Sequence, residues 1–205
     1  MLVYGQRHMR VMGLDPGMLR LGFAGVAQGE QLELITFGLI SNPRDPASKF
    51  NEHLNKSIHQ VTDDLPKALD LIRPDIIVSE TVPVGRLGSN TELVVASITT
   101  CKVIAHQFGI PWYDIGANTV KKEFTGDAKA SKVTIRNAVF DLFPIVEERH
   151  TKIKREQKSQ GRKMEGLPFD VFDAVAISVV GVNIHGNQDL HTVQEGEEGE
   201  AVLST

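Results

Sequence analysis

The alternation of apolar and polar positions near the start of the chain predicts three short β-strands. Residues 10–15 (RVMGLD), 22–28 (GFAGVAQ) and 32–41 (LELITFGLIS) are each of strand length. Turn-forming residues separate them, at positions 16–17 (Pro-Gly) and 28–30 (Gln-Gly-Glu). Short strands joined by short turns pair with their neighbours, so we expect an antiparallel meander to open the fold.

A long helix and a buried strand are predicted to follow the meander. Apolar residues recur at spacings of three and four over residues 47–72, which is the period of an amphipathic helix. Pro66 lies inside this stretch and is expected to kink or divide the helix, because proline has no backbone N–H. Residues 75–80 (DIIVSE) form an apolar run that ends in a carboxylate, which is typical of a central buried strand.

The second half of the chain alternates between helix and strand. Helices are predicted at residues 91–108, 131–143 and 168–185, and a further short strand at residues 110–115. Residues 147–163 are polar, basic and aperiodic, so we expect a loop or mobile arm there. A meander followed by alternating helices and strands indicates an α/β fold, with a mixed five-stranded sheet and helices on both faces.

Length and composition fit one globular domain. The chain has 205 residues, of which 41% are apolar, enough for one sizeable core. We expect residues 1–185 to form the domain and residues 186–205 to form an acidic, disordered tail. The single cysteine, Cys101, is expected to be a reduced core thiol. Neither a membrane-spanning stretch nor a secretion signal is visible, so a cytoplasmic location is expected.

The net charge of −4 is unevenly distributed along the chain. Residues 116–165 carry twelve basic and seven acidic side chains, whereas residues 166–205 carry seven acidic and no Lys or Arg side chains. A basic middle segment suits a partner with a phosphate backbone, and an acidic end is usually a solvated tail.

Four acidic residues stand in unusually apolar surroundings, namely Asp15, Glu80, Asp170 and Asp173. Taken singly, Asp15 could be a turn residue, Glu80 a solvent-exposed strand end and Asp170 a helix cap. Asp170 and Asp173 are three residues apart and so share one helix face. Because four buried like charges repel unless they are protonated or bound to cations, together they predict a metal site. Carboxylates suit Mg²⁺ or Mn²⁺, and two ions about 4 Å apart can hold both reacting oxygens of a phosphodiester.

Three segments resemble motifs of the RuvC-type Holliday junction resolvases, which have an RNase H-like fold of the retroviral integrase superfamily. GLDPGMLRLGFAGV (13–26) looks like the first-strand motif of that family, DIIVSE (75–80) like the strand with its catalytic Glu, and DVFDAVAI (170–177) like its final helix. The order and spacing of the three match over residues 9–185.

The resemblance implies that the four carboxylates are catalytic and bind two Mg²⁺ ions, for which Mn²⁺ can substitute. It also implies hydrolysis that leaves 5'-phosphate and 3'-hydroxyl ends. Family members use two lysines near the scissile phosphate, eleven residues apart, and Lys121 and Lys132 have that separation here. The alternative for these two is ordinary solvated surface lysines.

The sequence departs from the compact bacterial members at two places. Pro83 stands where they have an aromatic residue that is a candidate for stacking on bases at the junction centre. Either Arg86 or Leu87 takes the place of that residue, or the segment is an ordinary mobile loop. The basic arm is an insertion that is more similar to phage or viral relatives, and a loop without a partner is its alternative. Residues expected to contact DNA are Arg86, Lys122, Lys129, Lys152, Lys154, Arg155, Lys158, Arg162 and Lys163, with Arg149 adding to the basic arm.

We therefore expect a structure-selective endonuclease that cuts four-way DNA junctions and other branched DNA. Symmetric cutting of a two-fold junction calls for a homodimer, for which the helix at residues 91–108 is the candidate interface. The alternatives are an RNase H-like nuclease that acts on RNA, a junction-binding protein without nuclease activity, and an actin-like nucleotide-binding protein, whose first phosphate loop resembles residues 14–26.

Overall fold

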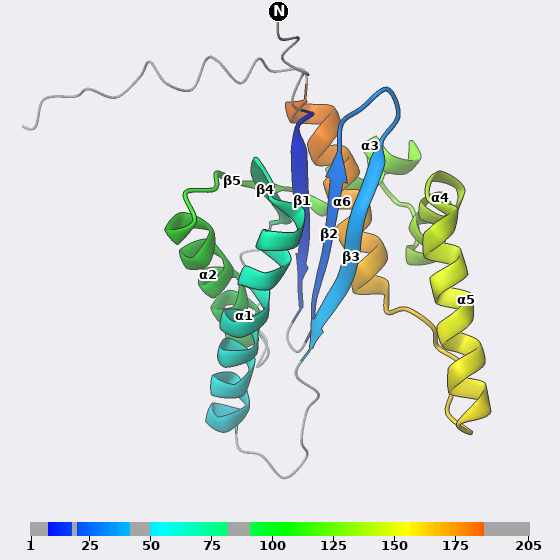
Figure 1. Cartoon of the computed structure of the whole chain (residues 1–205), viewed down its shortest axis with the longest axis horizontal. Coiled ribbons are helices and arrows are strands. Elements are labelled where there is room, and N and C mark those ends of the chain that lie inside the picture. Colours follow the sequence, from blue (N-terminus) through cyan, green and yellow to red (C-terminus); the bar gives the residue numbers. More distant parts are fainter. Residues whose placement is uncertain (1–7, 18–19, 42–49, 82–90, 187–205) are drawn as a thin grey trace, which may run out of the picture.

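A five-stranded sheet in the order β3-β2-β1-β4-β5 forms the centre of the computed structural model (Figure 1). The structure describes residues 8–17, 20–41, 50–81 and 91–186. The strands are β1 (Arg10–Pro16), β2 (Arg20–Ala27), β3 (Glu33–Ser41), β4 (Ile76–Glu80) and β5 (Trp112–Ile115). Strands β1, β2 and β3 pair antiparallel, whereas β4 runs parallel to β1 and β5 parallel to β4. The predicted meander and the mixed sheet are confirmed.

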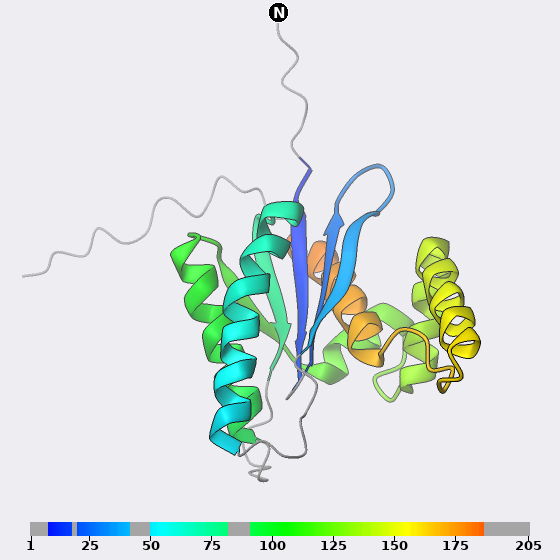
Figure 2. The same cartoon turned by 60° about the horizontal axis from the view of Figure 1, so that its bottom comes forward.

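Helices cover both faces of the sheet, as predicted (Figure 2). They are α1 (Phe50–Ile72), α2 (Thr91–Gln107), α3 (Ala117–Thr125), α4 (Lys132–Leu142), α5 (Pro144–Ser159) and α6 (Phe169–His185). Helices α1 and α2 pack together on one face, and α6 crosses β1 and β2 on the other. Helices α3 and α4 pack against α6, and α5 packs against α4 at the outside of the molecule.

Successive side chains of a strand point to opposite faces of the sheet, so the core has two apolar layers, one on each face. Met12 and Leu14 of β1 face α1 and α2, together with Ile77 of β4. Val11 of β1 and Val78 of β4 face α6 instead. Successive strand side chains alternate between faces, so a residue's parity decides which helices it contacts.

Of the two outcomes expected at Pro66, division of the helix does not occur, because α1 runs continuously to Ile72. Two further local predictions need correction. Residues 117–125, for which no element was predicted, form α3. Most of the predicted arm at 147–163 is helical, because α5 runs from Pro144 to Ser159 and the buried side chains of Val146 and His150 attach it to the rest of the fold.

Some of the predicted features lie outside the residues that the structure describes, and others lie away from the candidate site. Pro83, Arg86 and Leu87 lie outside the described residues, as does the predicted tail beyond Gly186. Cys101 is buried as predicted, and burial raises the pKa of its thiol to about 12. None of the helices in the described part of the chain is long and apolar enough to cross a membrane.

Candidate active site

Two of the four predicted carboxylates lie at the carboxyl ends of neighbouring parallel strands. Asp15 is the penultimate residue of β1 and Glu80 the last residue of β4. The strand register pairs Leu14 with Ser79, one residue before each carboxylate. Because side chains alternate along a strand, Asp15 shares the face of Val11, and this is the face that α6 covers.

Helix α6 carries the other two carboxylates and lies unusually close to the sheet. A Cβ atom at Gly22 would collide with the backbone oxygen of Asp170, and one at Gly13 with the backbone oxygen of Ala174. Only glycine permits this approach of helix backbone to strand backbone. Glycine at positions 13 and 22 thus allows the start of α6 to lie close to the end of β1.

Ser178 fastens α6 to both strands beneath it. Its buried hydroxyl has one hydrogen to donate, shared between the backbone oxygens of Ala24 (3.0 Å) and Ala174 (2.8 Å), and it accepts from the Gly13 N–H (3.0 Å). One side chain therefore connects β1, β2 and α6 at a fixed spacing.

Asp170 and Asp173 both lie next to a cation. Lys132 Nζ is 3.4 Å from Asp173 Oδ2, and Arg20 Nε is 3.5 Å from Asp170 Oδ2. The carboxylate side chains are 15% exposed at Asp173 and 21% at Asp170, whereas their cationic partners are more than half exposed. Pro168 is the N-cap of α6, so Asp170 lies in the first turn and is not the helix cap.

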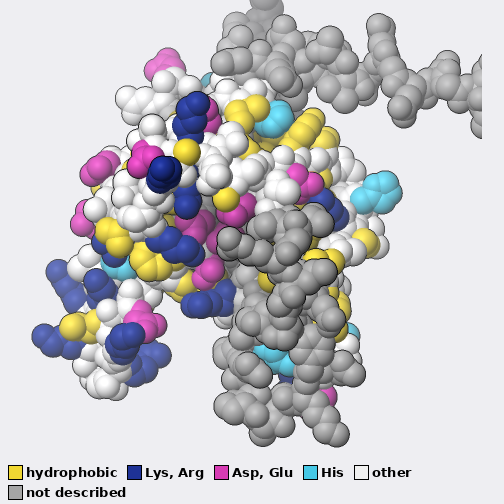
Figure 3. All heavy atoms as spheres, turned by 180° about the vertical axis from the view of Figure 1, so that it is seen from behind, with side chains coloured by type: hydrophobic (Ala, Val, Ile, Leu, Met, Phe, Trp, Pro, Cys, Tyr) yellow, Lys and Arg dark blue, Asp and Glu magenta, His cyan; other side chains and the backbone are white. Residues whose placement is uncertain are grey.

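The carboxylates also interact electrostatically. Burial raises the pKa of Asp15 from 3.8 to about 8, and repulsion by the other three carboxylates adds to the rise. Burial, followed by the charge of Asp173, raises the pKa of Glu80. The pKa of Asp173 is raised by burial as well, while Lys132 opposes the rise. The four acids therefore form one electrostatically coupled site. Figure 3 shows a group of acidic side chains bordered by Lys and Arg side chains on this face of the molecule.

Lys121 and Lys132 approach this site from separate helices. Lys132 is the first residue of α4, following the N-cap Ser131, and its Nζ also lies 5.9 Å from the centre of the Phe169 ring. Lys121 of α3 is close enough to lower the pKa values of Glu80 and Asp173. Lys122 and Lys129 are exposed, and within the described residues neither forms an ion pair.

The donor set fits divalent metal ions of the hard type. Within the described residues, no three His, Cys, Asp or Glu side chains converge closely enough to enclose one ion. Mg²⁺ seldom needs such a cage, because it is usually held by one or two carboxylates together with water and substrate phosphates. Burial, with repulsion by the neighbouring carboxylates, raises the pKa of Asp15 to about 8, and a bound cation would stabilise the charged form of such a carboxylate.

Arg20, which pairs with Asp170, and Ser178, which connects α6 to the strands, are two residues of the candidate site that sequence reasoning missed. The hairpin signal at Pro16 could have indicated Arg20, since the strand that returns beside β1 begins at this residue. Ser178 lies in an apolar helix, and nothing in its local pattern distinguishes a hydroxyl that bonds across the core from one that bonds back along the helix.

The mixed five-stranded sheet with helices on both faces is an RNase H-like fold. The family model described as crossover junction endodeoxyribonuclease RuvC matches residues 11–154. The chain belongs to this RuvC family, whose members depend on divalent metal ions.

Individual relatives are similar over most of the chain. The crossover junction endodeoxyribonuclease RuvC of Bordetella avium is 28% identical over 138 residues, which cover 67% of this chain and 73% of the relative. The RuvC structure of Thermus thermophilus has a TM-score of 0.63 at 21% identity and covers 87% of this chain and 97% of its own. T. thermophilus RuvC in complex with a Holliday junction substrate has a TM-score of 0.61 at 24% identity, covering 84% of this chain and 92% of its own.

Proposed function

We propose that the protein is a Mg²⁺-dependent, structure-selective endonuclease that cuts four-way DNA junctions and other branched DNA. The observation that carries this proposal is the meeting of four carboxylates from three elements at one end of the sheet, with two lysines beside them. Membership of the RuvC family and the similarity to a RuvC solved with a Holliday junction support the substrate.

In this proposal the four carboxylates, Asp15, Glu80, Asp170 and Asp173, are the metal ligands. Bound Mg²⁺ supplies positive charge to the phosphodiester oxygens and lowers the pKa of water. The protein's own contribution is a rigid arrangement, since two ligands lie on strands and two on a helix that Ser178 fastens to them. A preorganised site of this kind needs no rearrangement when charge develops on the phosphate.

Lys132 and Lys121 are proposed to offset the negative charge that develops during cleavage. Lys132 pairs with Asp173 at 3.4 Å, yet its side chain is 62% exposed, so it can turn toward a phosphate oxygen. Lys121 contributes positive charge near Glu80. Exposed Lys122 and Lys129 are proposed to contact the DNA backbone nearby.

Asp173→Asn tests the proposed function directly. Labelled four-way junction, flap, linear duplex and RNA duplex are each incubated with and without Mg²⁺. We expect the wild type to cut branched DNA only with Mg²⁺, and Asp173→Asn to lose at least about a hundredfold in rate while still binding the junction. Asp63→Asn, at an exposed position of α1, is the matched control and retains activity. Unchanged cleavage by Asp173→Asn, or preferential cutting of RNA, contradicts the proposal.

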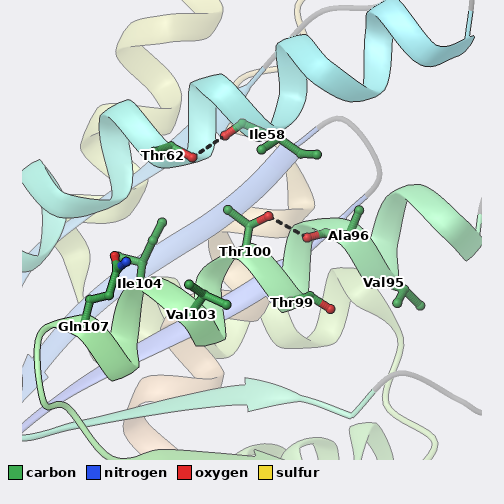
Figure 4. A pocket seen from close by; sticks show the side chains of 9 residues that line it. All are labelled: Ile58, Thr62, Val95, Ala96, Thr99, Thr100, Val103, Ile104 and Gln107. Carbon is green, nitrogen blue, oxygen red and sulfur yellow. Dashed lines mark hydrogen bonds between the residues drawn. The ribbon is translucent and has the colours of Figure 1, made fainter.

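A homodimer through α2 is part of the same proposal, because a four-way junction offers two symmetric strands for cutting. A groove of about 610 Å³ runs between α1 and α2, and Figure 4 shows the side chains that line it. Val95 and Val103 of α2 line this groove and are 47% and 52% exposed. Val103→Asp is expected to produce a folded monomer in analytical ultracentrifugation, and an unchanged sedimentation coefficient contradicts this interface.

A further inference from the structure

Helix α5 and the residues that follow it form a basic surface separate from the acidic site. Residues 144–163 carry seven basic and three acidic side chains, although the whole chain has a net charge of −4. Lys152, Arg155 and Lys158 follow one another at spacings of three and are exposed. None of these three forms an ion pair with any residue that the structure describes, so their charge is free to attract an anion.

The inner side of α5 is firmly attached to the segment that leads into α6. The Nδ1 atom of His150, a buried residue, accepts a hydrogen bond from the Leu167 N–H at 2.9 Å. The Oε1 atom of Gln157 accepts from the N–H groups of Glu165 (2.8 Å) and Gly166 (3.0 Å). Three consecutive backbone N–H groups are thus bound by α5, which gives the basic surface a defined position relative to the catalytic helix.

The position of α5 also separates it from the proposed cleavage chemistry. It is the outermost helix on the α6 side, beyond α4 (Figures 1 and 2). In Figure 3 its Lys and Arg side chains cover a lobe that stands apart from the acidic group. An anion bound to the basic residues on this lobe would therefore lie away from the carboxylate site.

We propose that the exposed side of α5 binds the sugar-phosphate backbone of a duplex arm of the branched substrate, away from the cleaved strand. This inference rests on the proposed function. Residues three apart on a helix rise by about 4.5 Å, so the three cations form a row along α5 that can follow a line of phosphates. The sequence of α5 contains no Phe, Trp or Tyr, which a helix bound to a membrane surface normally presents.

The test is the salt dependence of junction binding by Arg155→Gln/Lys158→Gln. Each lost phosphate contact reduces the slope of log K against log salt by about 0.9, so the double variant should lose about 2 from the slope. The loss should appear as weaker junction binding, because both residues lie on α5, away from the carboxylate site. Lys67→Gln/Arg73→Gln is the matched control. It also removes one Lys and one Arg charge, from exposed positions in α1 and directly after it on the other face of the sheet, and should keep the wild-type slope.

The same measurement on junctions with arms truncated close to the crossover locates the contact. We expect the wild type and the α5 variant to show equal slopes there, because the arm that α5 binds is missing. Equal slopes on full-length arms overturn the proposal, as does a difference that persists on truncated arms. If the wild type cuts no branched DNA, the proposed function fails, while the slopes on duplex DNA still decide whether α5 binds phosphates.

Discussion

Replacing Asp15 with asparagine should stabilise the metal-free protein and abolish cleavage. The carboxylate is largely buried at the end of β1, and burial together with repulsion by three other carboxylates raises its pKa to about 8. Asparagine keeps the size and one oxygen but has no charge to desolvate. The residue proposed to be essential for activity is therefore expected to be costly for folding.

The magnitude follows from the two pKa values of Asp15, 3.8 as the ordinary value and about 8 in the folded protein. Between these values the folded protein holds a proton that the unfolded chain has released, so wild-type stability falls as the pH rises through this window. Each pH unit corresponds to about 1.4 kcal/mol. Asp15→Asn should thus exceed the wild type by about 2 kcal/mol at pH 5 and about 4 kcal/mol at pH 7.

The assay is urea unfolding in the presence of a chelator at pH 5 and pH 7. Asp63→Asn, at an exposed position of α1, serves as the control and should match the wild type at both pH values. Adding Mg²⁺ should stabilise the wild type more than Asp15→Asn, because a cation bound to the carboxylates favours the folded state. Equal stability of wild type and Asp15→Asn, or a difference that does not grow with pH, would refute the electrostatic argument.

Three further substitutions test separate parts of the site. Lys132→Gln should lower kcat about a hundredfold with little change in KM, whereas Lys129→Gln should mainly raise KM; the reverse pattern contradicts the assignment. Ser178→Ala leaves a buried backbone N–H without its acceptor and should lower the free energy of unfolding by about 1–3 kcal/mol in thermal denaturation, and a loss near zero would argue against its fastening role. Gly166→Ala should destabilise by more than about 1 kcal/mol, because Gly166 has a φ of 73° and a Cβ there meets the His150 ring; adding His150→Ala should recover part of the loss in a double-mutant cycle.

The strands and the strongly apolar helices could be predicted from the sequence, because burial of one face repeats apolar residues at the spacing of a strand or a helix. The run at residues 75–80 matches β4, and the stretch beginning at Ser131 matches α4, whose N-cap Ser131 accepts a hydrogen bond from the Thr134 N–H. Strand parity also places Asp15 and Glu80 on the face that α6 covers. The fold class was therefore accessible from local patterns alone.

The two helices that were mispredicted lack an apolar stripe. In α3 only Val120 is buried, so no periodic signal exists. In α5 the inner side combines Val146 with His150 and Gln157, and the last two contribute hydrogen bonds rather than apolar area. The spacing of apolar residues does not reveal a helix that is attached to the fold by polar side chains.

Some residues of the candidate site could likewise be predicted from the sequence and others could not. The four carboxylates were conspicuous because charged residues are rare in apolar surroundings. Arg20, by contrast, reaches Asp170 only through the pairing of β2 with β1, and the Ser178 bond to Gly13 spans 165 residues. Such partners depend on tertiary geometry, which a single sequence does not display.

The origin of the carboxylates at opposite ends of the chain has a consequence for synthesis. Asp15 and Glu80 emerge early from the ribosome, whereas Asp170 and Asp173 emerge only when α6 has been made. A nascent chain that lacks α6 therefore has half of the proposed ligands and no helix to cover the end of β1. Nuclease activity is expected to begin only once the domain is complete, so interrupted translation yields fragments that leave DNA intact.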